Sequence, residues 1–394
     1  MDLRTSKTIA LKNKISYAHL RITISAVKFI CRIIGFWYTI NKPIKNKNII
    51  FFPHAQPGSD GYLRRFQEYF SYFNNDGIDY FIADVTTDRE EFIAISKGNT
   101  TKYNFIRKCL VKRFKQVLKA RRYKVAFVQR GLFLYYYDDN SAFFERLLQN
   151  LGVKVIVDYW DSVWNRNPAL VNNTVKYADS VSVVNDFLYG YFSKIHKKVY
   201  LFPIGVNLKR YHVKTDYSIK NNVVFFYTGQ PLNVEHFIIN ISPMLIEIGK
   251  KHPYTLRIVS KARFHIKNIN VEFFDFDEIT FFDLLVHSDI GLYHIEDSEI
   301  SRGKMAMKVL DYMSAGLPCI ASPFGLSPNV VNNDNILLAE SNEEWVEKIN
   351  LLTENKELRE KIGRSGRKMV EEHHEISNSY IIFTKILNKS QQNH

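Results

Sequence analysis

Two lysines and an aspartate recur at helical spacing in the stretch "RGKMAMKVLDYMSAG", whose apolar pattern predicts a helix from about Gly303. Lys304, Lys308 and Asp311 then share one face, at steps of four and three residues. Cations at a helix N-terminus oppose the helix dipole, whereas a phosphate bound there is stabilised by the dipole, the backbone N–H groups and the ammonium groups together. Arg302 adds a planar guanidinium, and a carboxylate one turn later suits sugar hydroxyls. The spacing indicates a nucleotide-sugar site or, alternatively, an ordinary solvated helix face.

The composition indicates a folded chain of two domains that favours an anionic partner. Its 394 residues exceed one ordinary core, and 46% of them are hydrophobic, which excludes a disordered chain. The net charge of +14 favours nucleic acid, acidic lipid or a phosphorylated substrate. Nothing resembles a recognition helix or a stacking-aromatic motif, so nucleic acid is not expected. Cys31, Cys109 and Cys319 lie far apart, which favours a reducing compartment over a disulfide framework or a zinc site.

A basic and apolar segment, "KISYAHLRITISAVKFICRIIGF", stands near the start of the chain. Lys14, Arg21, Lys28 and Arg32 form a narrow stripe at helical spacing, and apolar residues cover most of the remaining surface. No uncharged run reaches about 18 residues, and no small-residue cleavage site follows, so neither a membrane span nor a signal peptide is expected. The pattern predicts that residues 14–34 lie on an anionic membrane surface, or alternatively pack on the protein itself.

Two successive alternations of strands and helices follow, one from "NIIFFPHA" and one from "NVVFFYTGQP". Such alternations predict two doubly wound, parallel-sheet domains of the Rossmann-like α/β class. Ligands bind at the carboxyl ends of the strands in these sheets, so we expect the two domains to face each other across a cleft. The predicted parts are a basic N-terminal extension at 1–48, a first domain at 49–210, a second domain at 211–372, and a final helix with a polar tail at 373–394.

Polar residues follow several of the predicted strands and are candidates for the cleft. Asp158 and Asp161 end the apolar strand of "VIVDYWDSVW", either as ligand-facing carboxylates or as a helix cap. Their D-x-x-D spacing does not favour a metal site. Arg64 and Arg65 are expected on a solvated helix face. The other candidates at strand ends are His54, Gly58, Ser59, His294 and Glu296.

Several motifs together resemble GT-B glycosyltransferases of the large retaining family called GT4. "KVLDYMSAGLPCIAS" is similar to the family's donor-site signature "K-x-x-E-Y-M-A-x-G-x-P-V-V-A-S". "YADSVSVVNDFL" and "KVYLFPIGVNLKRY" resemble the exit from the first domain. "VIVDYWDSVW" is similar to a motif of one subgroup, and "GSDGYLRRFQEYF" resembles the first-domain loop and helix. "DIGLYHI" is similar to the strand before the donor pocket, and the motifs span roughly residues 49–375 in the family's order.

The resemblance implies a retaining glycosyltransferase that moves a sugar from a nucleotide-sugar donor to a lipid-linked or glycan acceptor in bacterial surface-polysaccharide assembly. It implies an acceptor-side first domain, a nucleotide-sugar-binding second domain and a last helix that crosses back to the first. It implies no metal and no cofactor besides the donor, and a peripheral place on the inner face of the cytoplasmic membrane. Catalysis would involve Asp158 and Asp161. The donor would be held by Gly229, Gln230, Glu296, Arg302, Gly303, Lys304, Lys308 and Asp311. The acceptor side of the cleft would be lined by His54, Gly58, Ser59 and His294.

Two departures from the family pattern leave alternatives open. Family members commonly carry two glutamates separated by seven residues, and this chain has Gly303 and Asp311 at those two positions. The usual Arg and Lys after the first strand of the second domain are missing from "YTGQPLNVEH". A non-catalytic subunit that binds glycans or docks another transferase therefore stays possible. A sugar-nucleotide epimerase of the same fold is a further alternative, although such an enzyme has no need of the basic start.

Overall fold

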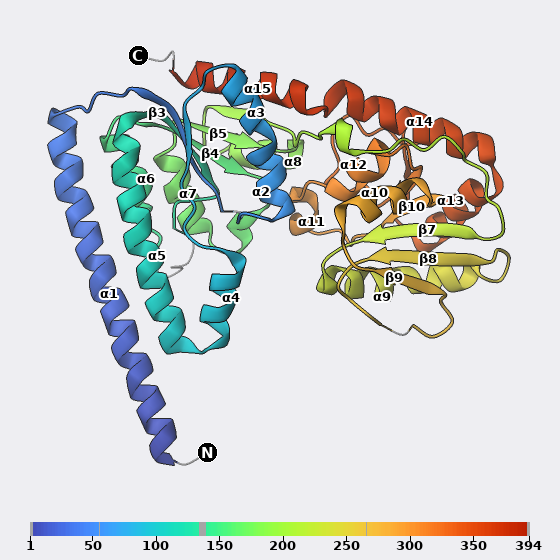
Figure 1. Ribbon diagram of the computed structural model, residues 1–394, viewed down its shortest axis with the longest axis horizontal. Helices are drawn as coiled ribbons and strands as arrows, with labels where there is room; N and C mark the ends of the chain where they lie inside the picture. The colour runs from blue at the N-terminus through green and yellow to red at the C-terminus, as the bar shows by residue number, and fades with distance from the viewer. Residues whose placement is uncertain (1–2, 55, 134–138, 265, 392–394) are drawn as a thin grey trace.

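The computed structural model describes residues 3–54, 56–133, 139–264 and 266–391. Two six-stranded sheets lie side by side, each covered by helices (Figure 1). Every pair of neighbouring strands is parallel, in the order β2-β1-β3-β4-β5-β6 in the first sheet and β12-β11-β10-β7-β8-β9 in the second. The predicted pair of doubly wound α/β domains is confirmed.

The first sheet is built of nearly continuous apolar runs, because helices cover both of its faces. Its strands are β1 (Lys47–Phe52), β2 (Tyr80–Ile82), β3 (Tyr123–Gln129), β4 (Lys154–Tyr159), β5 (Ser180–Val183) and β6 (Val199–Leu201). The helices around it are α2 (Asp60–Arg65), α3 (Phe70–Asn75), α4 (Asp88–Ser96), α5 (Asn99–Lys119), α6 (Phe143–Asn150), α7 (Pro168–Lys176) and α8 (Asp186–Phe192).

The second sheet has the same construction. Its strands are β7 (Val223–Thr228), β8 (Tyr254–Val259), β9 (Val271–Phe274), β10 (Ile290–Tyr293), β11 (Cys319–Ala321) and β12 (Leu337–Leu338). The helices of this domain are α9 (Pro231–Ile248), α10 (Glu278–Val286), α11 (Glu299–Gly303), α12 (Met307–Ser314), α13 (Asn342–Glu354) and α14 (Lys356–His373). The strand order reverses direction between β7 and β10, the position at which doubly wound sheets bind ligands.

Two segments connect the domains and are hydrogen-bonded to each other. The chain leaves β6 through Val206, whose N–H donates to the carbonyl of His374 at 2.6 Å. The returning chain then enters α15 (Ile376–Gln391), which runs back along the first domain (Figure 1). Phe383 of α15 lies in an aromatic cluster there, 5.1 Å from the ring of Phe202 and 5.3 Å from that of Phe127. The last helix is therefore part of the first domain's core.

A long helix, α1 (Leu3–Ile40), packs along α5 and α6 at the edge of the first domain (Figure 1). Its buried side consists of Leu20, Ile24, Val27 and Cys31. The opposite side carries what we call the apolar stripe, whose members are 47% to 71% exposed: Leu11, Ile15, Ile22, Phe29, Ile33, Phe36 and Ile40. None of the helices in the described ranges is long and apolar enough to cross a membrane.

Candidate functional site

The stretch that carries Lys304 and Lys308 forms two short helices rather than one. α11 ends at Gly303, the backbone is extended at Lys304 (φ −74°, ψ 158°), and α12 begins at Met307. The predicted helix start near Gly303 is therefore wrong. Lys304 lies outside α12 and is exposed to solvent.

Tertiary contacts explain the break between α11 and α12. A Cβ at Gly303 would lie 2.8 Å from the Cβ of Ser162 and 2.9 Å from its backbone nitrogen, so only glycine fits. The first domain also holds the carbonyls of this loop. The side-chain amide of Asn185 donates to the carbonyls of Arg302 at 3.1 Å and Lys304 at 2.9 Å. The loop is thus shaped by the neighbouring domain, which the helical spacing does not reveal.

Lys308 is a partly buried cation at the start of α12. Its Nζ lies 5.6 Å from the ring centroid of Tyr227 in β7 and 5.7 Å from that of Tyr293 in β10. β7 and β10 are paired, so the ammonium lies near the carboxyl ends of two central strands. Among the residues that the structure describes, no side chain forms a hydrogen bond or ion pair with Lys308. Burial, with the nearby charge of Lys304 as a second cause, lowers its pKa to about 8. An anion at this position would supply the missing counter-charge.

Gly229 and Gln230 lie close to this cation. They form the turn from β7 into α9, and a Cβ at Gly229 would lie 3.3 Å from the ring of Tyr227, the ring that also faces Lys308. Gln230 is the N-cap residue of α9, followed by Pro231 at the first helical position. Gly229 and the Lys308 ammonium therefore lie beside the same tyrosine ring. This arrangement is compatible with a phosphate group.

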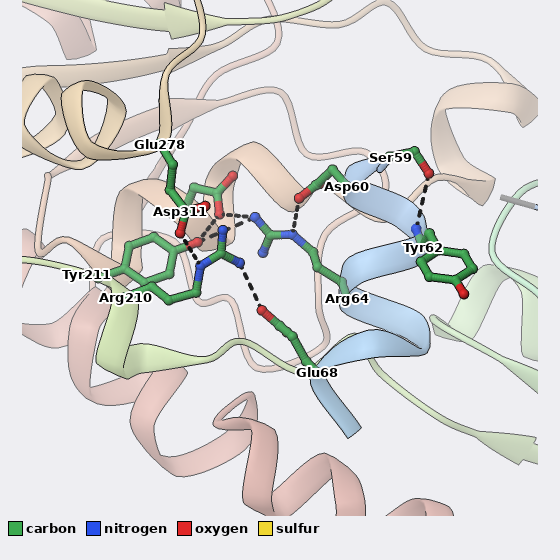
Figure 2. Close-up of polar contacts among 9 residues, drawn as sticks. All are labelled: Ser59, Asp60, Tyr62, Arg64, Glu68, Arg210, Tyr211, Glu278 and Asp311. Carbon is green, nitrogen blue, oxygen red and sulfur yellow. Dashed lines mark hydrogen bonds and ion pairs between the residues drawn. The ribbon is translucent and has the colours of Figure 1, made fainter. Parts of the chain in front are cut away.

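Asp311, one turn after Lys308, is buried at the contact between the two domains (Figure 2). Its Oδ1 accepts a hydrogen bond from Nη2 of Arg64 in α2 at 2.6 Å and a second from the hydroxyl of Tyr211. Arg64 also donates through Nε to Asp60 at 2.8 Å. Burial raises the pKa of Asp311, and the charge of Arg64 opposes this rise. Arg64 was expected on a solvated face, and this prediction is wrong because the side chain lies between the domains.

A second arginine spans the same contact (Figure 2). Nη1 of Arg210, in the segment between the domains, donates to Glu68 of the first domain at 2.9 Å. Its Nε donates to Glu278 of α10 in the second domain at 3.0 Å. Burial raises the pKa of Glu68 although Arg64 and Arg210 act against it. We call Arg64 and Arg210, with their four carboxylate partners, the arginine clip.

Asp158 does not face a ligand, contrary to the expectation for its strand end. Its side chain and that of Arg65 are fully buried, and the two form a bidentate ion pair with one contact of 2.9 Å between Arg65 Nε and Oδ2. Ser182 donates to Oδ1 at 2.6 Å. Both oxygens of the carboxylate therefore accept hydrogen bonds within the first domain. Arg65, also expected on a solvated face, is instead the buried partner that makes this possible.

Asp161 is placed differently from Asp158. It is partly exposed and forms an ion pair with Arg130. Its neighbour Ser162 donates to the carbonyl of Glu299 in α11 at 2.9 Å, so this segment touches the second domain next to the Lys304 loop. Of the two predicted carboxylates, only Asp161 lies at the domain contact with part of its surface accessible.

The remaining candidates fall into separate places. Arg302 is exposed and pairs with Asp297 through contacts of 2.6 and 2.7 Å. Glu296 is exposed. The ring of His294 lies 5.2 Å from that of Trp345 in a tilted arrangement, and burial lowers the pKa of His294. In the part of the chain that the structure describes, none of these three side chains forms a hydrogen bond or ion pair with Lys308.

In the first domain, the turn after β1 leads toward the clip. Gly58 has a left-handed φ of 88°, which permits this turn, and Ser59 caps α2, the helix that carries Arg64.

His54 lies instead in a small cavity at the ends of β1 to β3, beside Asp84 and Arg113. Burial and the charge of Arg130 lower the pKa of His54 to about 3, so the imidazole is neutral at physiological pH. No group of three His, Cys, Asp or Glu side chains suited to a metal occurs in the described part of the chain.

The sequence predictions missed four residues of this interface: Arg64, Tyr211, Arg210 and Asn185. Asn185 lies within "VVND", a stretch already noted for its resemblance, so a signal for it was present. The others contact partners far away in sequence; the bond from Arg64 to Asp311 joins residues 247 positions apart. No local spacing encodes such a contact.

Comparisons with known proteins agree with this architecture. Residues 262–381 match the family described as glycosyl transferase-like. A glycosyltransferase from Rickettsia africae superposes with a TM-score of 0.62 at 14% identity, covering 89% of this chain and all of that one. HepE from Anabaena, solved with UDP-glucose, gives a TM-score of 0.60 at 12% identity, covering 86% and 99% of the two chains. Sucrose-phosphate synthase from Thermosynechococcus elongatus gives 0.61 at 13% identity, covering 87% and 99%. No curated protein sequence matches the chain.

The structural likeness extends over both domains, and the family match covers the segment that contains α11, α12 and Lys308. Two facing Rossmann-like domains joined by a returning C-terminal helix define the GT-B arrangement found in these neighbours. Residues 262–381 are thus similar to glycosyl transferases, and the chain as a whole has the GT-B fold of these neighbours.

Proposed function

We propose that this chain transfers a sugar from a nucleotide-sugar donor to a lipid-linked or glycan acceptor, with retention of the anomeric configuration. The observation that carries the donor assignment is Lys308, a partly buried ammonium without an acidic partner among the described residues, near the carboxyl ends of β7 and β10. The donor diphosphate is the anion that this position would accept. The structures of HepE with UDP and with UDP-glucose support a donor of this class.

In this proposal the chemistry is mainly electrostatic. The bond from the sugar to the diphosphate breaks, and negative charge develops on the leaving phosphate oxygen. Lys308 and the backbone N–H groups at the start of α9, next to Gly229 and Gln230, would stabilise that charge. Lys304 and Arg302 are exposed and would add charge only at the rim. The partly exposed Asp161 is the carboxylate available to orient the sugar or the acceptor hydroxyl.

The affinity of a nucleoside diphosphate should depend on pH through Lys308. Its pKa of about 8 lies below the ordinary value, so the ammonium loses its proton as the pH rises through 8. Binding that requires the ammonium should weaken by about tenfold per pH unit above 8. Because an arginine at position 308 keeps its charge, the affinity of the Lys308→Arg variant for the nucleoside diphosphate should stay constant up to pH 9.5. Calorimetric titrations at pH 7, 8, 9 and 9.5 measure this, and parallel profiles of the two proteins would rule out Lys308 as the titrating group.

We further propose that the protein acts on the inner face of the cytoplasmic membrane, as expected for surface-polysaccharide assembly, and that α1 provides the contact with anionic lipid. The apolar stripe extends over ~44 Å of helix from Leu11 to Ile40. Lys14, Arg21 and Arg32 run along one edge of it, and all three are exposed. α1 contains no acidic residue, so two copies paired along the stripe would bring like charges together. A surface with exposed apolar residues and a basic edge fits an anionic bilayer better than a second copy.

A double substitution in the apolar stripe, Phe29→Ser with Ile33→Ser, should reduce binding to anionic vesicles. Both side chains are more than half exposed, so stability should change little. The measurement is co-sedimentation with vesicles of phosphatidylglycerol and phosphatidylcholine, beside vesicles of phosphatidylcholine alone. Ile279→Ser, at a still more exposed apolar residue of α10, is the matched control. Wild-type protein that ignores anionic vesicles and elutes as a dimer would instead assign the stripe to a second copy.

A further inference from the structure

The two oxygens of Asp311 are used unequally. Oδ1 accepts the bonds from both Arg64 and Tyr211, whereas Oδ2 accepts none from any residue that the structure describes. Oδ2 is also not one of the fully enclosed atoms that lack a partner. Asp311 follows Lys308 by three positions in α12, so the two side chains share one face of the helix. One oxygen is tied to the other domain, and the second is available beside the proposed donor site.

We propose that Arg64 is a positioning residue that fixes the Asp311 carboxylate through Oδ1, so that Oδ2 can accept a hydrogen bond from a hydroxyl of the donor. This inference rests on the proposed nucleotide-sugar function. The donor group would be a sugar hydroxyl of the nucleotide, because it must reach Oδ2 while the diphosphate reaches Lys308. Arg64 belongs to the first domain, so the donor site of the second domain would be completed only when α2 is in contact with it.

The guanidinium of Arg64 is itself held in place. Its Nε donates to Asp60 in the first turn of α2, and its Nη2 lies 3.4 Å from the Tyr211 hydroxyl as well as 2.6 Å from Asp311. The side chain is 7% exposed, so water competes little for these bonds. A planar guanidinium that is hydrogen-bonded through both Nε and Nη2 fixes the direction of the Asp311 carboxylate more firmly than a lysine ammonium would.

The second half of the arginine clip provides a natural control. Arg210 also links the two domains, through Glu68 and Glu278, but no described bond joins it to Asp311. Loss of either arginine weakens the domain contact. Only the loss of Arg64 also releases Oδ1 of Asp311. The two substitutions therefore separate the positioning of Asp311 from the general alignment of the domains.

The inference also predicts reciprocity. If Arg64 strengthens donor binding through Asp311, a bound donor must strengthen the contact between α2 and α12 by the same factor. Protection of the α2 backbone from hydrogen exchange should thus increase when the nucleoside diphosphate is added, although α2 belongs to the other domain.

The test compares four variants of the full chain with wild type by calorimetric titration with UDP, GDP, CDP and TDP. Arg64→Leu should weaken the affinity of the nucleotide that binds wild type by at least ~10-fold, as expected for a lost charged hydrogen bond. Arg210→Leu should stay within ~3-fold of wild type. Tyr211→Phe removes the other hydrogen-bond donor to Oδ1 without leaving a cavity, and it should weaken nucleotide affinity by a few-fold. If Arg64→Leu does not fold, Tyr211→Phe still tests whether the bonds to Oδ1 matter for binding. Arg64→Lys should restore only part of the loss.

Equal losses in Arg64→Leu and Arg210→Leu would overturn the inference, because the clip would then act only by holding the domains together. Unchanged affinity in both Arg64→Leu and Tyr211→Phe would overturn it as well. In either case the proposed function survives, since wild-type protein binds a nucleotide. Wild-type protein that binds none of the four nucleotides would overturn the proposed function, and this inference with it.

Discussion

Replacing Lys308 by alanine will weaken the binding of the nucleoside diphosphate by about 100-fold and abolish measurable sugar transfer. A charged hydrogen bond to phosphate in a partly desolvated place contributes ~2–3 kcal/mol, and about 1.4 kcal/mol corresponds to a tenfold change. The two tyrosine rings that surround the ammonium cannot replace it, because they offer no positive charge to the diphosphate. Calorimetric titration at pH 7 gives the affinity, and transfer from a labelled nucleotide sugar gives the activity.

Lys304→Ala is the matched control for this prediction. Lys304 is exposed and lies in the loop before α12, where solvent screens its charge. We expect its removal to change affinity by less than ~3-fold. If Lys304→Ala abolished binding and Lys308→Ala did not, the phosphate would bind in the loop, and the assignment of Lys308 would be wrong.

Replacing Asp158 by asparagine will destabilise the first domain by ~3–5 kcal/mol, the usual cost of removing one partner of a buried ion pair. The Arg65 guanidinium would stay fully buried without its counter-charge, against the ring of Phe202 and the carbonyl to which it donates at 2.9 Å. The carboxylate would thus have a structural role, unlike the catalytic role that its place at a strand end first suggested.

Urea unfolding, followed by circular dichroism, measures this loss. Asp161→Asn is the control, because its ion pair with Arg130 is partly exposed and should contribute less than ~1 kcal/mol. An Asp158→Asn protein that unfolds like wild type but has lost turnover would show that Asp158 acts in the reaction after all.

The α/β architecture was predictable because parallel strands buried on both faces leave an unmistakable apolar pattern. β4, with Val155, Ile156 and Val157 all fully buried, is an example. Lys308 and Asp311 were also found from spacing, since both lie within the helix that the pattern indicates. The N-terminal helix was expected as well, although Lys28, counted in its basic stripe, forms an ion pair with Asp139 at 2.5 Å.

What the sequence could not reveal depends on contacts between the domains. The helix was expected to start near Gly303, but Ser162 of the first domain packs closely against that glycine, and the helix is interrupted there. Arg64 and Arg65 have the spacing of a solvated surface, and each is buried because an aspartate lies opposite it in the folded chain. Charge pairs between distant residues follow from topology, and local patterns of charge or hydrophobicity do not record them.

The most direct test of the account is a crystal structure of the protein with the nucleoside diphosphate that binds it most tightly. We predict that a phosphate oxygen lies within hydrogen-bond distance of the Lys308 Nζ, close to the start of α9, and that a ribose hydroxyl donates to Oδ2 of Asp311. A nucleotide bound away from α12 would contradict the donor site. The donor site would also be contradicted if no nucleotide bound at concentrations well above those at which nucleotide-sugar donors ordinarily bind, and a docking or glycan-binding subunit would then be favoured.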